Sequence, residues 1–480
     1  MAMTDQSGTS MLERHEKAAR EFLPQVKLII GGEERDRGDG GEHHHINPAT
    51  GCVQAEVPLA GPRQIDEAVR AARTALGPWQ RTHPAERRRI LSKFADLVRA
   101  HNWTEVSVLE NGQPWDQAGN MAGFGASWVD YYAGWADRIE GEVTADNETD
   151  GFIYTVPEPH GVVAMIITWN APVLSLAMKL PAALAAGNTI VLKPAEFTSF
   201  TAMDWMQLAR EAGIPDGVIN LVPGGPDAGE ALVAHPGVDK ISFTGGPPTA
   251  KSIMRGAAEQ LTPVLFELGG KGANLIFDDA DLAEVVPFSC GFALTNTGQG
   301  CALPTRMLVQ RGVYDEVIGR IETVMPHLTV GDPLVSGHLG GPLVNQAALK
   351  WVALLIRRGF VSMACEVDGA GGVEGFLGGA GRASGVQQGV LVAVVGGGVD
   401  GEAEGVGGAA VAEPEQRDLL AVAEHAGDVG EAAVVPGPDF GQLRPVGLGV
   451  IQQPQDDGAA GRFRDGGHVA HHAARPPRAG

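Results

Sequence analysis

The chain has 480 residues, of which 44% are hydrophobic, and a formal net charge of −22. This length predicts two or three domains, and the acidic balance argues against nucleic acid and membrane partners, because both are bound by clustered lysine and arginine. No apolar run approaches the roughly 18–20 residues of a membrane span, and the first residues lack a signal-peptide pattern. The four cysteines are scattered without a CxxC pair, so we expect a cytoplasmic protein with reduced thiols.

Residues 1–24 are interpreted as an N-terminal extension. Good helix formers fill residues 62–110, as in RQIDEAVRAARTAL and AERRRILSKFADLVRAH, so this stretch is predicted to be helical. Three consecutive histidines, residues 43–45, lie in an extended segment where neighbouring side chains point to opposite sides. We therefore expect a surface loop there rather than a metal site, and no metal site elsewhere, because the C-terminal histidines lack zinc-ligand spacing.

From residue 161, short β-branched runs alternate with helical stretches. The predicted strands cover residues 161–169, 188–194, 217–224, 239–246 and 273–279. The predicted helices cover residues 174–187 and 199–213, the second closed by Gly213, and a third helix begins near Thr249. Strands and helices that alternate with short links predict a parallel sheet covered on both faces, whose ligands bind beyond the carboxyl ends of the strands.

Residues 357–480 break this pattern. They are rich in glycine and alanine, contain no lysine, asparagine or threonine, and include runs such as VVGGGVDGEAEGVGG with neither a helical nor a strand period. Such a composition is typical of segments that cannot form a packed core. We interpret this tail as a disordered segment or as the out-of-frame translation of GC-rich coding DNA.

Three polar residues stand at or just after the ends of the first two predicted strands. Asn170, in TWNAP, could donate its side-chain amide to a developing oxyanion, although the same residues could form a plain turn. Lys193 and Glu196, in VLKPAE, could bind the hydroxyls of a ribose, or form a solvated charge pair before a helix. A carboxylate beside a ribose would repel a 2′-phosphate, which favours NAD over NADP.

Glycines follow two further strands. Thr244, Gly245 and Gly246, in SFTGGPPTAK, join a strand to a helix, whose N-terminal N–H groups can bind a pyrophosphate. Gly225 and Gly229, in VPGGPDAGEAL, offer the same chemistry. Either segment taken alone is equally compatible with a simple turn.

Two reactive side chains come next along the chain. Glu267, in FELGGK, lies between apolar residues and two glycines, where an apolar pocket would suit a general base; the alternative is a carboxylate paired with Lys271. Cys301, in NTGQGCALPTR, stands among small and turn-forming residues. It is either a nucleophile or one of the small buried thiols that fill protein cores.

Together these motifs resemble the aldehyde dehydrogenase superfamily, from about residue 25 to residue 356. FELGGK followed by GQGC is the most specific signature, and INPATG, ITWN, KLPAALAAGNTIVLKPAE, FTGG and VGDPL fall in the family's order. The resemblance implies an α/β fold with a Rossmann-type parallel sheet in a cofactor domain, residues 25–263, with a bridging segment near 126–150. A second α/β domain, residues 264–356, would carry the catalytic thiol and be incomplete.

The resemblance implies NAD-dependent oxidation of a small aldehyde to a carboxylic acid. Cys301 would attack the aldehyde carbon to give a thiohemiacetal, and hydride transfer to NAD would leave a thioester. Glu267 would activate Cys301 or the hydrolytic water. Asn170 and the backbone N–H of Cys301 would form the oxyanion hole, and Lys179 matches a family lysine near the proton path.

The resemblance also implies the cofactor contacts, with NAD preferred over NADP and Lys193 and Glu196 at the adenine ribose. The residues expected to contact NAD are Ile166, Thr168, Trp169, Lys193, Glu196, Gly225, Gly229, Phe243, Thr244, Gly245, Gly246 and Leu268.

The chain departs from the family at several places. Gly246 and Ala250 stand where the family has serine and glycine, and the EEIFGP and PFGG segments, which hold the nicotinamide and line the substrate site, are absent after residue 356.

A homo-oligomer is expected if the family's C-terminal strand is not essential. Two alternatives stay open: a catalytically impaired NAD-binding or oligomerisation relative, and a thiol esterase that uses Cys301 and Glu267.

Overall fold

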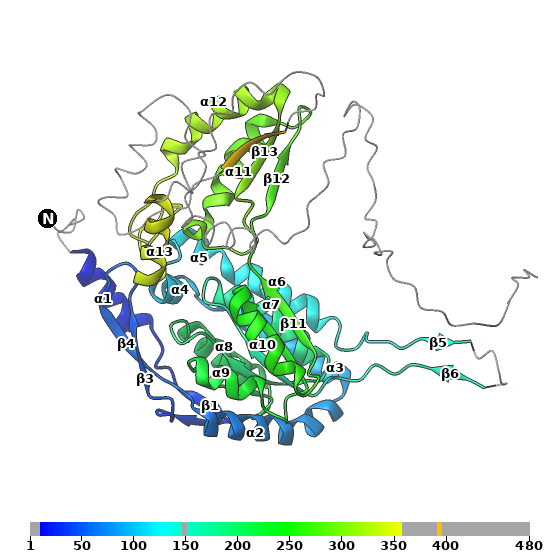
Figure 1. The fold of residues 1–480 in the computed structure, drawn as a ribbon. Coiled ribbons are helices and arrows are strands. Elements are labelled where there is room, and N and C mark those ends of the chain that lie inside the picture. Colours follow the sequence, from blue (N-terminus) through cyan, green and yellow to red (C-terminus); the bar gives the residue numbers. More distant parts are fainter. Residues whose placement is uncertain (1–9, 146–150, 358–390, 396–480) are drawn as a thin grey trace, which may run out of the picture. The chain divides into compact units, whose positions relative to one another are not determined.

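The computed structural model describes residues 10–145, 151–357 and 391–395 (Figure 1). All of them belong to one compact unit, Met1–Gly396. The interpretation of residues 357–480 as disordered or out of frame therefore falls almost wholly outside the described residues. The exceptions are Arg357, which ends a helix, and strand β14 (Leu391–Val395), which the sequence analysis did not predict.

The larger sheet has seven strands. Their order is β11 (Val264–Leu268), β10 (Lys240–Gly245), β7 (Val162–Ile166), β8 (Thr189–Lys193), β9 (Ile219–Leu221), β1 (Leu28–Ile30) and β2 (Glu33–Arg35). The first five strands are parallel, which confirms the predicted parallel sheet. β1 and β2 add an antiparallel edge that was not predicted, and Gly31 and Gly32, with φ of 61° and 89°, form the tight turn between them.

Helices cover both faces of this sheet (Figure 1). One face packs on α2 (Pro62–Arg81), α9 (Pro226–Val233) and α10 (Pro247–Ala258), and the other on α3 (Pro84–Ala100), α6 (Met121–Ala133), α7 (Pro172–Ala185) and α8 (Phe200–Ala212). In β8, Ile190 and Leu192 join one apolar core while Val191 joins the other, because neighbouring side chains of a strand point to opposite faces.

The predicted helical stretch 62–110 consists of three helices, α2, α3 and α4 (Thr104–Asn111). Pro84 occupies the first position of α3, and a proline disfavours helical backbone in the residue before it, so the chain breaks after α2. The predicted end of α8 is confirmed, since Gly213 follows it with a left-handed φ of 100°.

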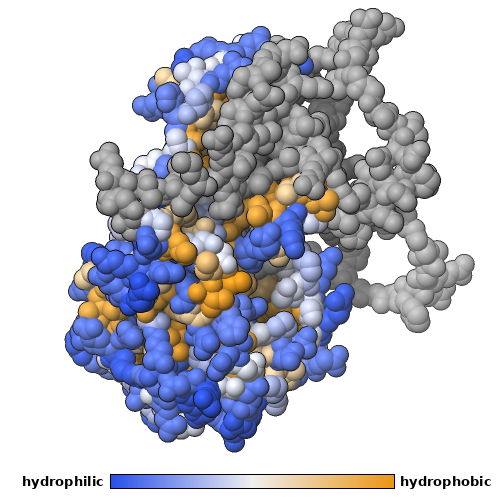
Figure 2. Space-filling model, turned by 90° about the vertical axis from the view of Figure 1, so that its left-hand side faces the viewer, coloured by the Kyte–Doolittle hydropathy of each residue, from blue (hydrophilic) through white to orange (hydrophobic). Residues whose placement is uncertain are grey.

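A smaller sheet contains β12 (Ala273–Ile276), β13 (Arg306–Gln310) and β14, all parallel. Helices α11 (Leu282–Leu294) and α12 (Tyr314–Val324) pack on it around a third core. Several large apolar side chains of β12, its following loop and α11 are exposed, namely Leu275, Phe277, Phe288 and Phe292. Apolar patches are visible on the molecular surface (Figure 2), and the exposure of these side chains is that among the described residues.

The remaining elements lie outside the two sheets described above. They are α1 (Met11–Phe22), β3 (Glu42–Ile46), β4 (Val53–Pro58), α5 (Trp115–Gly119), β5 (Val143–Thr144), β6 (Ile153–Tyr154), α13 (Gln346–Arg357) and three short 3-10 helices, η1 (Thr295–Gly298), η2 (Arg311–Val313) and η3 (Met325–His327). Helix α1 is anchored by Arg14 and His15, whose side-chain nitrogens each lie 2.8 Å from the Asp332 carboxylate.

The prediction of a surface loop at the three histidines is wrong. They lie in strand β3, and His45 is buried, with its pKa lowered to about 4 by that burial. Within the described ranges, no three side chains of the metal-binding types cluster around a common point. The same ranges contain no helix with the length and apolar character needed to span a membrane.

Candidate active site

Cys301 lies in an exposed turn between η1 and β13. The alternative of a buried filler thiol is therefore wrong for Cys301. That description fits Cys290, which is buried in α11 and whose pKa is raised to about 11 by burial. Of these two thiols, Cys301 is thus the one open to a small molecule.

The residues before Cys301 have an unusual backbone. Asn296 and Thr297 are buried and have left-handed φ angles of 50° and 58°, a conformation that costs on the order of 1 kcal/mol or more for a residue other than glycine. Hydrogen bonds hold this shape: the N–H of Asn296 donates to Gln117 Oε1 at 2.8 Å, and Thr297 Oγ1 accepts from the N–H of Gly341 at 2.8 Å. The turn that carries the thiol is therefore fixed from two sides.

The structure brings Asn170 to this turn from the end of β7. Asn170 Nδ2 donates to the backbone oxygen of Gln299 at 2.8 Å, and Thr168 Oγ1 donates to Asn170 Oδ1 at 3.0 Å. Gln299 lies two residues before Cys301, so the amide and the thiol lie on neighbouring segments although 131 positions separate them in the sequence (301 − 170). A plain turn at Asn170 would not need this contact with a segment far away in the sequence.

Lys179 and Glu267 also lie near one another. Lys179 Nζ donates to Ser242 Oγ at 2.8 Å, and the register of β10 and β11 pairs Thr244 with Glu267. Burial lowers the pKa of Lys179 to about 8, an effect that the negative charge of Glu267 opposes. The described residues do not form the apolar pocket expected around Glu267, because β11 is the edge strand of their seven-stranded sheet and Glu267 is exposed among them.

Replacing Lys179 with methionine is expected to change how stability depends on pH. With a folded-state pKa of about 8 against a model-compound value of 10.5, the unfolded chain binds more protons between these two values. The contribution of Lys179 to the free energy of unfolding should therefore rise between about pH 8 and pH 10.5, by at most about 3 kcal/mol. Urea unfolding at both pH values should show this rise reduced in Lys179→Met and retained in the exposed-site control Lys251→Met. An equal rise in all three proteins would contradict the assignment.

The proposed ribose-binding residues lie at the end of β8, beside the helix that follows β9. Lys193 is buried, and within the described part of the chain its hydrogen bond goes to the oxygen of the adjoining Pro194 at 3.4 Å. Burial lowers the pKa of Lys193, and the negative charge of half-buried Glu196 opposes this. Gly229 of α9 lies against the lysine stem, where an added Cβ would be 3.6 Å from Lys193 Cε, and Gly225 precedes the first residue of the same helix.

The end of β10 is shaped by a glycine and an unpartnered hydroxyl. A Cβ on Gly245 would lie 2.4 Å from the buried Phe243 ring, so any other residue there would require the ring to shift. Thr244 Oγ1 is buried and lacks a hydrogen-bond partner among the described residues. Gly246 precedes the first residue of α10, and Leu268, paired with Gly245, is exposed.

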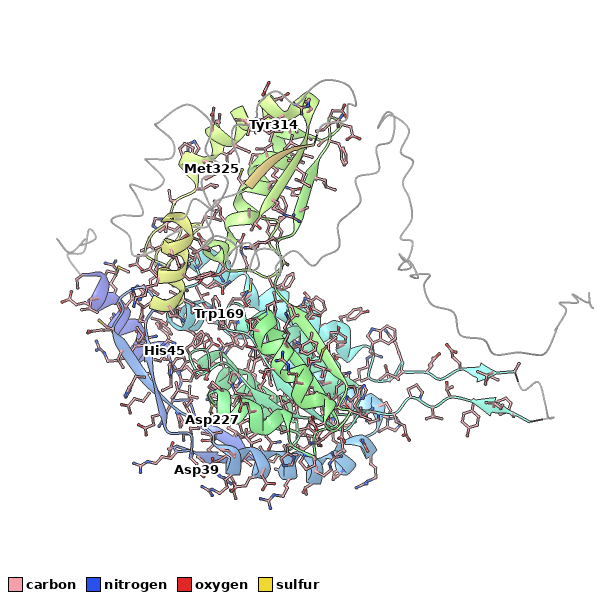
Figure 3. All side chains as sticks on the ribbon, viewed as in Figure 1. Asp39, His45, Trp169, Asp227, Tyr314 and Met325 are labelled. Carbon is pink, nitrogen blue, oxygen red and sulfur yellow. The ribbon has the colours of Figure 1, made fainter. Side chains whose placement is uncertain are left out.

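Three further predicted contacts, Ile166, Thr168 and Trp169, are half-buried at the end of β7. The Trp169 ring lies 6.2 Å from that of Phe197, which belongs to the loop after β8. His45 of β3 reaches the same loop, since its Nε2 lies 3.0 Å from the oxygen of Phe197 (Figure 3). The loops after β7 and β8 therefore adjoin one another.

Two buried residues that the sequence analysis did not single out contact the loop after β7 and the start of α8, which follows the loop after β8. Glu110 accepts the N–H groups of Phe200 and Thr201, and Asn111 Nδ2 donates to the backbone oxygens of Trp169 and Asn170. The only sequence signal at this place is NGQP, a turn pattern that says nothing of these distant partners.

Comparison with known proteins agrees with this geometry. The sequence profile described as the aldehyde dehydrogenase family matches residues 36–380. Mitochondrial succinate-semialdehyde dehydrogenase of Arabidopsis thaliana is 36% identical over 345 residues, which cover 71% of this chain and 65% of that relative. This chain thus spans slightly less than two thirds of that relative's length.

Solved structures give the same result. An NAD+ complex of aldehyde dehydrogenase from Bacillus cereus aligns with a TM-score of 0.68 and 38% identity, covering 71% of each chain. An NADP-dependent enzyme of E. coli aligns with a TM-score of 0.68 and 33% identity, covering 73% of this chain and 72% of the other. By sequence and by fold, the chain belongs to the aldehyde dehydrogenase family.

Proposed function

We propose that the chain is an NAD-dependent aldehyde dehydrogenase that oxidises a small aldehyde to a carboxylic acid. The observation that carries this proposal is the hydrogen bond between Asn170 and Gln299, which joins an amide donor to the turn of an exposed cysteine. A thiol nucleophile beside a side-chain amide can form a covalent adduct and stabilise its oxyanion.

In this proposal the Cys301 thiol loses its proton to Glu267 through water, Glu267 passes that proton on to solvent, and the thiolate attacks the aldehyde carbon. The amide of Asn170 and the N–H of Cys301 donate to the oxygen that becomes negative. Bound NAD would supply the hydride acceptor: as the hydride leaves the adduct carbon the carbonyl re-forms, and a thioester remains on Cys301. Glu267 removes a proton from the water that hydrolyses this thioester, and the acid leaves with the thiol restored. Lys179, with its pKa lowered to about 8, accepts or returns a proton near Glu267.

The residues at the strand ends fit a dinucleotide. The buried ammonium of Lys193 and the carboxylate of Glu196 suit the ribose hydroxyls, and the helices that follow Gly225 and Gly246 present N-terminal N–H groups for the pyrophosphate. The unpartnered Thr244 hydroxyl is a further group that a ligand would satisfy. Leu268 and the half-buried Ile166, Thr168 and Trp169 complete this proposed set.

Replacing Glu196 with glutamine is expected to reduce the preference for NAD over NADP. The carboxylate would lie beside the 2′ position, where it repels a phosphate, and glutamine removes that repulsion while keeping the shape. The ratio of the Kd for NADP to the Kd for NAD should fall about tenfold, as for the loss of one like-charge contact near a protein surface. Calorimetric titration of both cofactors would measure it, with Glu230→Gln on α9 as the control. An unchanged ratio would place Glu196 away from the ribose.

The proposed function is tested by NADH formation from purified chain, NAD and a panel of aliphatic and aromatic aldehydes. NADH formed in step with carboxylic acid would support it. Binding of NAD without turnover would instead support the impaired relative, and ester hydrolysis unaffected by removing NAD would support the thiol esterase.

The cellular setting is also part of the proposal. The three cysteines in the described ranges, Cys52, Cys290 and Cys301, are free thiols, which suits a reducing cytoplasm. Exposed apolar side chains on the β5–β6 hairpin, including Val143, Phe152 and Tyr154, support assembly into a homo-oligomer.

A further inference from the structure

The last two residues of α4 contact two different segments: Asn111 contacts the loop after β7, and Glu110 contacts the first two residues of α8, where the loop after β8 ends. We propose that Glu110 and Asn111 are positioning residues that fix the loop after β8 and the loop after β7, respectively, and thereby set the affinity for the cofactor. This inference rests on the proposed function, because those loops carry the residues assigned to NAD. Neither residue is assigned contact with the substrate or cofactor.

Asn111 fixes the loop after β7. Its side chain is 1% exposed, and its Nδ2 donates to the oxygen of Trp169 and to the oxygen of Asn170, both at 3.1 Å. Asn111 Oδ1 accepts the N–H of Gln113 at 3.1 Å, which fixes the orientation of the amide. The two peptide oxygens beside the proposed oxyanion donor are therefore tied to a rigid helix end.

Glu110 fixes the loop after β8 by capping the helix that follows it. Its carboxylate accepts the N–H of Phe200 at 2.6 Å, the N–H of Thr201 at 3.1 Å, and the Thr201 hydroxyl. Ser199 precedes α8 but does not cap it, since its hydroxyl donates to the oxygen of Ala195. A residue from another helix thus satisfies the N-terminal N–H groups of α8.

The end of α4 is itself held in place. Gln54 Nε2 donates to the oxygen of Leu109 at 2.7 Å, and His45 Nε2 lies 3.1 Å from the oxygen of Glu110. Gly112 ends the helix with a left-handed φ of 78°. A side chain at the end of such a fixed helix can hold a loop in one conformation, and a loop held in its binding conformation gives a lower apparent Kd.

The chemistry of both side chains is specific to these partners. Two backbone N–H groups donate to Oε1 of Glu110 and the Thr201 hydroxyl donates to Oε2, so an ionised carboxylate accepts all three hydrogen bonds. A glutamine would keep an oxygen at the two N–H groups but remove the negative charge, and a hydrogen bond to a neutral acceptor is weaker. Burial raises the pKa of Glu110 to about 7, which the hydrogen bonds from Thr201 and Phe200 oppose. Asn111 is instead a donor to its partners. An aspartate at this position would face two backbone oxygens with no hydrogen to donate.

Two isosteric variants test the inference: Glu110→Gln and Asn111→Asp, with Glu105→Gln and Asn102→Asp as matched controls. Asn102 and Glu105 lie at the other end of α4, where they bond to each other at 2.7 Å. Hydrogen–deuterium exchange of the unliganded chain would be measured at about pH 8, where Glu110 is mainly ionised. Calorimetry under the same conditions gives the Kd for NAD.

We expect Glu110→Gln to speed amide exchange in residues 200–201 about tenfold and to leave residues 167–171 unchanged, and Asn111→Asp to do the reverse. Each variant should raise the Kd for NAD about fivefold to tenfold, while the controls change neither quantity. If Glu110→Gln does not fold, Thr201→Val removes one donor to the same carboxylate and should give a smaller increase in the same segment.

Equal acceleration in both loops, or an unchanged Kd despite faster exchange, would overturn the inference. Absence of NAD binding by the wild type would overturn the proposed function and the part of the inference that concerns the cofactor. The exchange pattern would still decide whether the two residues fix the two loops, so the two failures are distinguishable.

Discussion

Replacing Cys301 with alanine is expected to abolish aldehyde-dependent NADH formation, with kcat falling by roughly 10⁴-fold or more, as for the loss of a covalent nucleophile. The thiol is exposed on a turn whose shape is fixed by Gln117 and Gly341, and alanine removes only its sulfur. The fold and the affinity for NAD should therefore stay close to those of the wild type. Steady-state NADH production and calorimetric titration of NAD measure the two effects separately.

Cys52→Ala is the matched control, because Cys52 is also an exposed free thiol but lies in the loop between β3 and β4. It should retain the full rate. A Cys301→Ala protein that still forms NADH at the wild-type rate would refute the role of the thiol.

The sequence was sufficient to predict the central part of the fold. Strands β7 and β8 are buried on both faces, so each contains an uninterrupted apolar run, VVAMI in β7 and IVL in β8, and turn residues follow their ends. Strand β11 was missed for the opposite reason. It is an edge strand with exposed Leu265, Glu267 and Leu268, and such a mixed pattern does not distinguish a strand from a helix end.

The candidate site was predicted only as separate motifs. That Asn170 meets the turn of Cys301 depends on contacts between segments far apart in sequence, to which no local pattern refers. The left-handed backbone of Asn296 and Thr297 is likewise unexpected, because a β-branched threonine disfavours that conformation and tertiary hydrogen bonds maintain it.

Glu110 and Asn111 show a different limit of sequence reasoning. Apart from the Thr201 hydroxyl, the partners named for their side chains in these two loops are backbone groups between 58 and 91 positions away, and a backbone group has no residue type that could signal the pairing. His45 was misplaced for a related reason. Neighbouring histidines in an extended segment do alternate between two sides, but the sequence does not reveal that one of those sides is packed against the loop after β8.

Replacing Asn170 with alanine is expected to lower kcat by about 10²–10³-fold, the usual effect of removing one oxyanion donor, with a smaller effect on the KM for the aldehyde. The variant should fold and bind NAD normally, because Asn111 and Asn296 contact the backbone oxygen of Asn170, which alanine retains.

Two further variants separate this role from a purely structural one. Thr168→Val removes the hydroxyl that donates to Asn170 Oδ1, so the amide is less firmly oriented and kcat should fall less, by about tenfold. Asn120→Ala, an exposed asparagine bonded to the oxygen of Asp116, is the control and should leave kcat unchanged. If Asn170→Ala raised KM while kcat stayed constant, the amide would bind the aldehyde in its ground state and would not stabilise the oxyanion. The order of the kcat values of Asn170→Ala, Thr168→Val and Asn120→Ala therefore tests whether the Asn170 amide, which bonds to the turn of Cys301, takes part in catalysis.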